Sequence, residues 1–438
     1  MEPTITVIIP VYNAASMLRS CLERLGQSNY RKMQCIVVDD GSTDSSAAVA
    51  REFGATVVRT PGRSGPARAR NLAAQAATGE ILFFVDSDVC VYPDTVGRVA
   101  AHFADPELDA VIGCYDEAPG CKDFLSQYRN LMHCFVHQNG CATASTFWSG
   151  CGAIRRSVFL EHGGFDESYQ RPAVEDIELG YRLARGRRKM ILDKNIQVKH
   201  LKRWTFWGLV KTDIFDRGIP WTELILRERF LPNDLNVQVS QRISVALIFV
   251  TFGMAMALAI YYKGYFLTPL FTALFLLLSC YWVEAAQPKP KKAIAGVTAV
   301  VAAIVGLALQ FHMLAMIPLV LLASLLLVLR YQFYGGDRGR QRTGLLLGVY
   351  IGLATMVALA YLPGRLTQLF IGLLLVIVFL NRRFYFFLAR RGRLFALAAI
   401  PFHLLYHFYC GLSFLIGFSR HSMESLRWRS RRPEAARQ

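Results

Sequence analysis

The second half of this 438-residue chain contains very few acidic residues. Most of the 32 aspartates and glutamates precede residue 240, and from Ile243 to Phe418 apolar blocks are separated by short, mostly basic patches. Blocks of about 20 apolar residues match the hydrocarbon thickness of a bilayer. This pattern excludes an ordinary soluble protein with one buried core and predicts a soluble domain followed by a membrane domain.

The chain also lacks a CxxC pair and a recognisable signal peptide. Its ten cysteines are scattered, and eight of them lie in the first half, which favours reduced thiols over a disulfide framework. The opening stretch "MEPTITVIIPVYN" has neither a basic start nor a cleavage site. We therefore expect the N-terminal domain to stay on the cytosolic side of a membrane.

The basic residues indicate lipid rather than nucleic acid as the partner. The formal net charge is +17, but the lysines and arginines gather at the ends of apolar blocks and in the C-terminal tail. In those positions they fit anionic lipid headgroups. We expect contact with the lipid bilayer and no binding of nucleic acid.

The first 200 residues alternate between strand and helix signals. Runs rich in Val and Ile, such as "TITVIIPV" and "EILFFV", are separated by segments with helical periodicity. This alternation predicts an α/β domain whose mostly parallel sheet is covered by helices on both faces. In such sheets ligands bind at the carboxyl ends of the strands, where Asp39, Asp40, Asp86 and Asp88 fall.

The stretch "FFVDSDV" ends an apolar run with Asp86 and Asp88. Carboxylates at the end of a buried strand are costly to desolvate unless a positive charge meets them. Mg²⁺ and Mn²⁺ prefer oxygen ligands and bind through a few carboxylates together with substrate phosphates. The pair therefore points to a divalent cation with a phosphate-bearing substrate, although a solvated turn would also explain one aspartate.

The motifs "VIIPVYN", "VVDDGSTD", "ARARN", "FFVDSDV", "GGFDE" and "VEDIELGYRL" occur in this order across residues 7 to 183. Together they resemble glycosyltransferase family 2, a family of inverting enzymes with the GT-A fold that use nucleotide-diphosphate sugars. The resemblance implies a Rossmann-like GT-A catalytic domain with Mg²⁺ or Mn²⁺ as cofactor. The donor-binding residues that it implies are Pro10, Tyr12, Asn13, Asp39, Asp40, Arg70, Asn71, Asp86 and Ser87.

Inverting transfer needs a base for the acceptor hydroxyl and positive charge for the leaving nucleoside diphosphate. The resemblance implies that Asp86 and Asp88 hold the metal and that Asp176 is the base, with Glu175 beside it. The last two residues are also compatible with the acidic first turn of a helix. His200, at the end of "NIQVKH", is expected either to complete the metal shell or to be a half-buried structural histidine.

The acceptor side is expected to include Gly150 and Gly152, which would let the backbone approach a ligand. It is also expected to include Arg217 and Trp221 of "RGIPW", which resembles the Q/RxxRW motif of polysaccharide synthases and ceramide glucosyltransferases. Pro220 replaces the second arginine of that motif. Because proline lacks an N–H and tends to break a helix, this difference favours a single transfer over polymerisation.

Four residues with helical spacing could form a second metal site. The spacing of His133, Cys134, His137 and Cys141 is compatible with a metal site and with one face of a helix beside the active site.

The sequence predicts four segments. Residues 1–200 form the GT-A domain, 201–240 amphipathic helices at the membrane interface, 241–419 a transmembrane domain of six or seven helices, and 420–438 a basic tail. The block Leu394 to Phe418 is either a seventh span or a re-entrant segment broken at Pro401. The six expected spans are 243–262, 265–286, 293–311, 313–332, 343–362 and 366–381.

These observations predict a multi-pass protein of the cell (inner) membrane whose catalytic domain is cytosolic, since the basic connections fall on one side. The expected activity is transfer of one sugar to a lipid acceptor: polyprenyl phosphate, a lipid-linked saccharide or a glycolipid. One alternative is a processive polysaccharide synthase that exports its polymer. Another is a flippase or transporter with a non-catalytic sugar-binding domain.

Overall fold

A computed structural model describes residues 2–261 and 365–430 of the chain. The described residues fall into two compact units. The first lies within Met1–Cys121, Arg129–Gln238 and Leu412–Gln438, and the second within Lys122–Tyr128 and Val239–Gly411. The four expected spans 265–286, 293–311, 313–332 and 343–362 lie outside the described residues. The functional division at residues 200, 240 and 419 stays a prediction.

The first unit is built on a sheet with the strand order β3-β2-β1-β4-β7-β6-β8-β5 in the described part of the chain. β1 runs parallel to β2 and β4, and β2 runs parallel to β3. β7 is antiparallel to both of its neighbours, and β5 is antiparallel to β8 at the edge. The predicted α/β architecture with a mostly parallel sheet is confirmed. The strands are β1 Ile5–Val11, β2 Met33–Asp39, β3 Thr56–Arg59, β4 Ile81–Val85, β5 Val89–Val91, β6 Leu108–Tyr115, β7 Cys151–Arg155 and β8 Lys189–His200.

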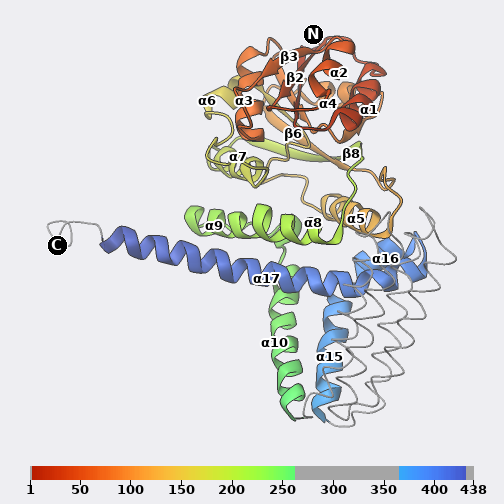
Figure 1. The fold of residues 1–438 in the computed structure, drawn as a ribbon, viewed down its shortest axis with the longest axis vertical. Helices are drawn as coiled ribbons and strands as arrows, with labels where there is room; N and C mark the ends of the chain where they lie inside the picture. Colours follow the sequence, from red (N-terminus) through yellow and green to blue (C-terminus); the bar gives the residue numbers. More distant parts are fainter. Residues whose placement is uncertain (1, 262–364, 431–438) are drawn as a thin grey trace. The chain divides into compact units, whose positions relative to one another are not determined.

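Helices cover both faces of this sheet, as Figure 1 shows. Because side chains alternate along a strand, the adjacent residues Phe83 and Phe84 point to opposite faces, and both are fully buried. Phe83 joins Leu18 in the core under α1, α2 and α4, whereas Phe84 joins Ala73 in the core under α3, α6 and α7. The helices of this unit's N-terminal part are α1 Ala15–Gly26, α2 Ser46–Glu52, α3 Pro66–Ala76, α4 Thr95–His102, α6 Arg156–Glu161 and α7 Glu175–Arg185. A further helix, α5 (Phe124–Gln138), belongs to the first unit from Arg129 onward.

The strand register brings the predicted acidic residues to one edge of the sheet. Val11 of β1 pairs with Asp39 of β2, and β4 ends at Val85, immediately before Asp86. Parallel strands that pair in register end at the same edge. The carboxyl ends of β1, β2 and β4 are therefore neighbours, as expected for a ligand site in an α/β sheet.

A continuous helical segment follows β8. It consists of α8 (Phe206–Lys211), the π-helical η1 (Thr212–Gly218) and α9 (Ile219–Glu228). The sequence suggests a break at Pro220, but Pro220 lies in the first turn of α9, where a missing N–H is tolerated. The π-helical turn directly before it accommodates the change in hydrogen bonding, so the helix is not broken. After α9 comes a short 3₁₀ turn, η2 (Leu235–Val237).

The second unit contains α10 (Val239–Tyr261), α15 (Arg365–Leu380), α16 (Arg382–Ala389) and the first part of α17 (Arg393–Ser430). The expected spans 243–262 and 366–381 coincide with α10 and α15. Asn381, between α15 and α16, is 4% exposed. Its amide donates to the hydroxyl of Ser244 and accepts from the side chain of Gln241, both at 2.9 Å. The buried amide thus joins α10 to α15, as polar groups often do between membrane helices.

Two described helices are long and apolar enough to cross a membrane, namely Val239–Leu258 and Arg393–Glu424. The pair Gln368–Leu380 and Arg382–Ala389, bent by 66°, would add a third if it counts as one span. α17 continues through Pro401, so the suggested break there is not observed. Whether this block is a seventh span or a re-entrant segment stays a prediction.

Candidate active site

The loops after β1 and β2 form the predicted nucleoside side of the site. Tyr12 is 40% exposed, and the guanidinium of Arg63 lies over its ring, 4.4 Å from the centroid. Asp39 is buried, accepts a hydrogen bond from the Ser42 N–H at 2.9 Å and pairs with Arg59 at 3.3 Å. An exposed aromatic ring beside a buried carboxylate suits a flat group that also offers hydrogen-bond donors.

Asp40 and Asn13 stabilise these loops. Asp40 is buried, and its carboxylate accepts from the N–H groups of Ser64 at 2.8 Å and Gly65 at 2.9 Å, just before α3. Asn13 has a positive φ of 49°, and its side-chain oxygen accepts from the Thr43 N–H at 2.8 Å. Both side chains therefore fix the backbone around the predicted donor pocket.

Arg70 connects two of the predicted acidic residues. Its guanidinium is buried and donates to Asp86 Oδ1 at 2.7 Å and to Glu175 Oε1 at 3.0 Å. Burial raises the pKa of Asp86 and of Glu175, and the charge of Arg70 opposes both shifts. The side chain thus joins the end of β4 to the start of α7, although Arg70 and Glu175 are 105 residues apart in sequence.

Asp176 is fixed at the start of α7. Its Oδ2 accepts hydrogen bonds from the N–H of Ser149 at 3.1 Å and from the Ser149 hydroxyl at 3.2 Å, while its Oδ1 accepts from the Ile177 N–H at 2.8 Å. The charge of Asp176 also contributes to the raised pKa of Asp86. The predicted base and the predicted donor carboxylate therefore belong to one site.

Asp88 and His200 meet where β5 pairs with β8. Val89 and His200 are register partners, and the N–H of Leu201 donates to the Asp88 carbonyl at 2.8 Å. The His200 Nε2 lies 3.5 Å from Asp88 Oδ2. Burial favours a higher pKa for Asp88, but the neighbouring His200 and Lys202 outweigh it and the pKa is lowered.

The chemistry of these side chains fits a hard divalent cation. Within the described residues, no three His, Cys, Asp or Glu side chains are grouped closely enough to hold a metal by themselves. Mg²⁺ is commonly held by one or two carboxylates and completes its coordination with water and substrate phosphates. Asp88 and His200 are placed to supply such a partial shell, and Asp86 lies beside them with one oxygen paired to Arg70.

A cluster of rings lies behind His200. Tyr115 stacks on His200 with centroids 4.2 Å apart and planes 9° apart, and it also contacts His133 at 4.4 Å and Trp148 at 4.9 Å. His133 in turn contacts His137 at 4.2 Å. Burial lowers the pKa of His137 to about 4, so this cluster is an uncharged wall of the site at neutral pH.

The ring cluster favours one interpretation of the spacing of His133, Cys134, His137 and Cys141. His133 and His137 lie on the face of α5 that meets Trp148. Cys134 is buried and Cys141 is exposed beyond the end of the helix. No group of three or more metal-ligating side chains occurs among the described residues, and the ring contacts favour the interpretation of these four residues as a helix face beside the site.

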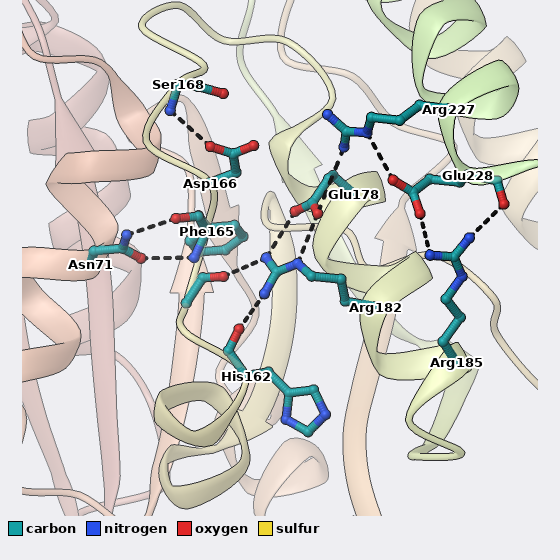
Figure 2. Close-up of polar contacts among 11 residues, drawn as sticks. Asn71, His162, Phe165, Asp166, Ser168, Glu178, Arg182, Arg185, Arg227 and Glu228 are labelled. Atoms are coloured by element: carbon teal, nitrogen blue, oxygen red, sulfur yellow. Dashed lines mark hydrogen bonds and ion pairs between the residues drawn. The ribbon is translucent and has the colours of Figure 1, made fainter. Parts of the chain in front are cut away.

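Asn71 contacts the "GGFDE" loop (Figure 2). Its side-chain NH₂ donates to the Phe165 carbonyl at 2.8 Å, and its oxygen accepts from the Phe165 N–H at 2.9 Å. The NH₂ also donates to Glu167 at 3.0 Å. The amide is therefore used to hold this loop, a role that the sequence, which suggested a donor contact for Asn71, did not indicate.

Arg182 of α7 holds the same loop from the other side (Figure 2). It donates to the carbonyls of His162 and Gly164 and to both carboxylate oxygens of Glu178 at 2.8 Å. Glu178 also lies 3.9 Å from Arg227 of α9. These contacts connect the loop to α7 and α7 to α9, so the helix that begins with the predicted catalytic residues is anchored along its length.

The predicted acceptor glycines make room for aromatic side chains. A Cβ on Gly150 would lie 2.7 Å from the ring of Trp148, and a Cβ on Gly152 would lie 2.8 Å from the ring of Phe147. Both distances are too short for a real contact. The two glycines thus allow close packing inside the domain, which is an alternative to the expected approach of a ligand to the backbone.

Trp221 and Arg217 occupy different positions along the helical segment. The indole N–H of Trp221 donates to the hydroxyl of Tyr181 on α7 at 3.1 Å. Arg217 lies in η1, and its charge acts on Tyr115 and His133 of the ring cluster. Trp221 therefore anchors α9 to α7, whereas Arg217 lies near the site.

Several neighbours of the site were not singled out by the sequence. Ser149, Arg63 and Asn130 contact Asp176, Tyr12 and His200 respectively. Ser149 directly precedes Gly150, which the sequence analysis does name, whereas no local pattern marks Arg63 or Asn130. The remaining predicted residues lie at the same edge of the sheet: Pro10 within β1 and Ser87 in the turn after β4.

Comparison with protein families gives a match over residues 6–163 to the model described as glycosyl transferase family 2. The chain contains a glycosyltransferase family 2 domain. All donor-side residues discussed above, together with Ser149, fall inside the matched stretch, whereas Asp176 and His200 lie beyond it.

Curated relatives resemble this domain over part of their length. Glycosyltransferase GlyG of Streptococcus pneumoniae is 32% identical over 27% of this chain and 42% of its own. Pre-mycofactocin glycosyltransferase of Mycobacterium tuberculosis is 31% identical over 41% of this chain and 38% of its own. The chain thus spans less than half of the length of these relatives.

Solved structures are similar at a lower level. Mannosyltransferase PcManGT from Pyrobaculum calidifontis, in complex with GDP-Man and Mn²⁺, is 19% identical, with a TM-score of 0.39 over 74% of this chain and 87% of its own. The TarS fragment of S. aureus in complex with UDP-GlcNAc is 18% identical, with a TM-score of 0.41 over 51% and 65% of the two chains.

Proposed function

We propose that this chain is a membrane-bound, inverting glycosyltransferase that moves one sugar from a nucleotide-diphosphate donor to a lipid or lipid-linked acceptor at the cytosolic leaflet. The observation that carries this proposal is the bridge that Arg70 forms between Asp86 and Glu175. It brings the donor-side carboxylates next to the acidic pair at the start of α7. A transferase needs both groups in one site, because the bonds to donor and acceptor change together.

On the donor side, Tyr12 and Asp39 would hold the nucleoside, and Asp88, His200 and Asp86 would hold a divalent cation with the diphosphate. When bound, Mg²⁺ or Mn²⁺ would neutralise charge that develops on the leaving nucleoside diphosphate. The ion pair between Arg70 and Asp86 leaves the second oxygen of Asp86 without a partner among the described residues. That oxygen would therefore be available to the donor complex.

On the acceptor side, Asp176 would act as the base. The acceptor hydroxyl oxygen forms a bond to the anomeric carbon of the sugar while the bond from that carbon to the phosphate oxygen breaks. The hydroxyl proton passes to the Asp176 carboxylate, and the nucleoside diphosphate leaves with the electron pair. The hydrogen bonds from Ser149 and Ile177 would hold the carboxylate in a fixed orientation for this step.

A lipid acceptor is supported by the composition of the described helices. α10 and α17 are long and apolar enough to cross a membrane, and the segment from Phe206 to Glu228 combines basic residues with Trp207, Trp221 and other aromatic rings. Such a segment suits the interface of a bilayer. By the positive-inside rule, basic stretches such as "NRRFYFFLARRGR" support a position of this interface at the cytosolic leaflet.

The experiment uses the full chain in detergent or nanodiscs with a panel of nucleotide-diphosphate sugars and membrane lipid extracts. Products are followed by mass over time with excess donor. We expect one discrete product, a lipid plus one sugar, because Pro220 has neither the charge nor the N–H of the arginine found in polymerising enzymes. A ladder of longer products would contradict single transfer and favour a polysaccharide synthase.

Metal dependence is tested in the same assay. Excess chelator should abolish turnover, and Asp88→Ala should do so without loss of fold. The matched control is Asp94→Ala, which removes an exposed carboxylate that pairs with Arg98 and should leave turnover unchanged. Full turnover in excess chelator would contradict the metal assignment, and the absence of transfer with every donor would contradict the proposed activity.

A further inference from the structure

Each ring nitrogen of His200 faces an oxygen atom, one on the proposed metal ligand Asp88 and one on Asn130, which has no role in the donor or acceptor chemistry. Its ring is 7% exposed, and one ring nitrogen, Nε2, faces Asp88 Oδ2 at 3.5 Å. The other, Nδ1, lies 3.1 Å from the side-chain oxygen of Asn130 on α5. Asn130 is 2% exposed, so this second contact is shielded from water and sensitive to the orientation of the amide.

The orientation of the Asn130 amide is fixed by a second hydrogen bond. Its NH₂ group donates to the Asp116 carbonyl at 3.3 Å. Only the nitrogen of the amide can donate to a carbonyl, so the amide oxygen must face His200. An oxygen is an acceptor, and the Nδ1 of His200 therefore carries a hydrogen and donates it to Asn130.

This assignment decides what Nε2 can do. In the neutral imidazole, a hydrogen on Nδ1 leaves Nε2 with its lone pair, and this lone pair points towards the carboxylate of Asp88. Two acceptors that face each other repel unless a positive group lies between them, either a proton on Nε2 or a bound cation that replaces this proton. A divalent cation with imidazole and carboxylate ligands meets that requirement, and metal-bound histidines generally donate their other N–H to a fixed acceptor in this way.

The plane of the ring is fixed as well. Tyr115 stacks on His200 at 4.2 Å with planes only 9° apart, and Trp148 contacts Tyr115 edge-on at 4.9 Å. Tyr115 therefore determines the tilt of the imidazole, and Asn130 determines its rotation within the plane and its tautomer.

We propose that Asn130 is a positioning residue that keeps the Nε2 lone pair of His200 directed towards Asp88, where a divalent cation would be held. This inference rests on the proposed metal-dependent function. Asn130 touches neither the cation nor a substrate and acts only through His200. The carbonyl of Asp116 in turn accepts a hydrogen bond from Asn130. The side chain of Asn130 on α5 therefore connects this carbonyl to His200 at the end of β8.

The test measures the affinity of the full chain for Mn²⁺ alone, by the electron paramagnetic resonance signal of free Mn²⁺ during a titration. Asn130→Leu and Asn130→Ala remove the acceptor and should weaken Mn²⁺ binding by roughly 10- to 100-fold. Asn130→Asp keeps an acceptor oxygen and should bind Mn²⁺ within about threefold of the wild-type chain. The matched control is Asn139→Leu, an exposed position one residue beyond α5, which should leave the affinity unchanged.

The outcomes separate this inference from the proposed function. Wild-type affinity in a folded Asn130→Leu or Asn130→Ala variant would overturn the inference alone, as would weak binding by Asn130→Asp that matches the Leu variant. The wild-type chain should bind Mn²⁺, and Asp88→Ala should lose this binding. If the two bind Mn²⁺ equally, or if neither binds it, the metal assignment itself fails and the inference fails with it. Thermal unfolding of each variant identifies those that are folded, and the Asp and Ala variants keep the comparison valid should Leu not fit.

Discussion

Replacement of Arg70 by Met is expected to destabilise the family 2 domain strongly. Arg70 is buried, and so is its partner Glu175, whereas the side chain of Asp86 is 35% exposed. Removing one partner of a buried ion pair costs roughly 3–5 kcal/mol because the other charge stays buried and unpaired. An exposed pair contributes about 0–1 kcal/mol, so most of the loss arises from Glu175.

The assay is thermal unfolding of the full chain in detergent, followed by tryptophan fluorescence. A change of 1 kcal/mol shifts the unfolding temperature of a domain of this size by roughly 2–4 °C, so Arg70→Met should lower it by about 6–20 °C. Arg68→Met is the matched control, because Arg68 lies on the same helix and its pair with Glu167 is 3.9 Å long and half exposed. The double variant Arg70→Met, Glu175→Gln should recover much of the loss, since it removes the unpaired charge.

The effect of pH has a defined sign. Burial raises the pKa of Glu175 above its ordinary value of 4.5, and Arg70 opposes this shift, so Arg70→Met should raise it further. A carboxyl group with a raised pKa takes up a proton on folding. Its contribution to stability is present below pH 4.5 and is lost as pH rises through the raised pKa. The deficit of Arg70→Met relative to the wild type should therefore shrink on acidification from pH 7.

Two results would refute this reasoning. One is an unfolding temperature for Arg70→Met within about 2 °C of the Arg68→Met control. The other is a double variant no more stable than Arg70→Met, which would show that Arg70 and Glu175 are not coupled.

Two further substitutions separate catalysis from structure. Asp176→Asn should lower the turnover of bound donor by about 10²- to 10⁴-fold and leave nucleotide-sugar affinity unchanged, as measured by single-turnover kinetics and calorimetry; lost affinity with normal turnover would make Asp176 a donor-site residue. Asn71→Leu leaves the Phe165 N–H and carbonyl without their partner and should cost about 2–6 kcal/mol in thermal unfolding. Wild-type stability in that variant would contradict the structural role of Asn71.

The sequence predicted the local framework of the first unit well. The apolar runs became buried strands, and the helical segments between them cover both faces of the sheet. The positions of Asp39 and Asp86 at strand ends also followed, because a strand's end is a local property and parallel strands end at one edge. Glu175 and Asp176 begin a helix, as their acidic pattern indicated.

Local rules failed where neighbouring turns compensate. Pro220 suggested a break, but a π-helical turn before it lets the helix continue. Gly150 and Gly152 suggested a backbone open to a ligand, which stays a prediction, and their close approach to Trp148 and Phe147 offers a packing role as an alternative. In both cases the outcome depends on the packing of residues around the position, which a single-residue preference does not contain.

By itself, the sequence determined the succession of strands and helices along the chain and the apolar character of the second half. It also determined which residue types follow the ends of the strands. Each of these follows from local patterns of polarity and turn formation. Only the tertiary structure decided the partners within the site. Arg70 meets Glu175 across 105 residues, and Asn130 meets His200 across 70. Such pairs arise when distant segments pack together, and nothing in the spacing of either residue along the chain specifies the other. The physical reason is that side-chain contacts are set by strand order and register, which the whole domain fixes together.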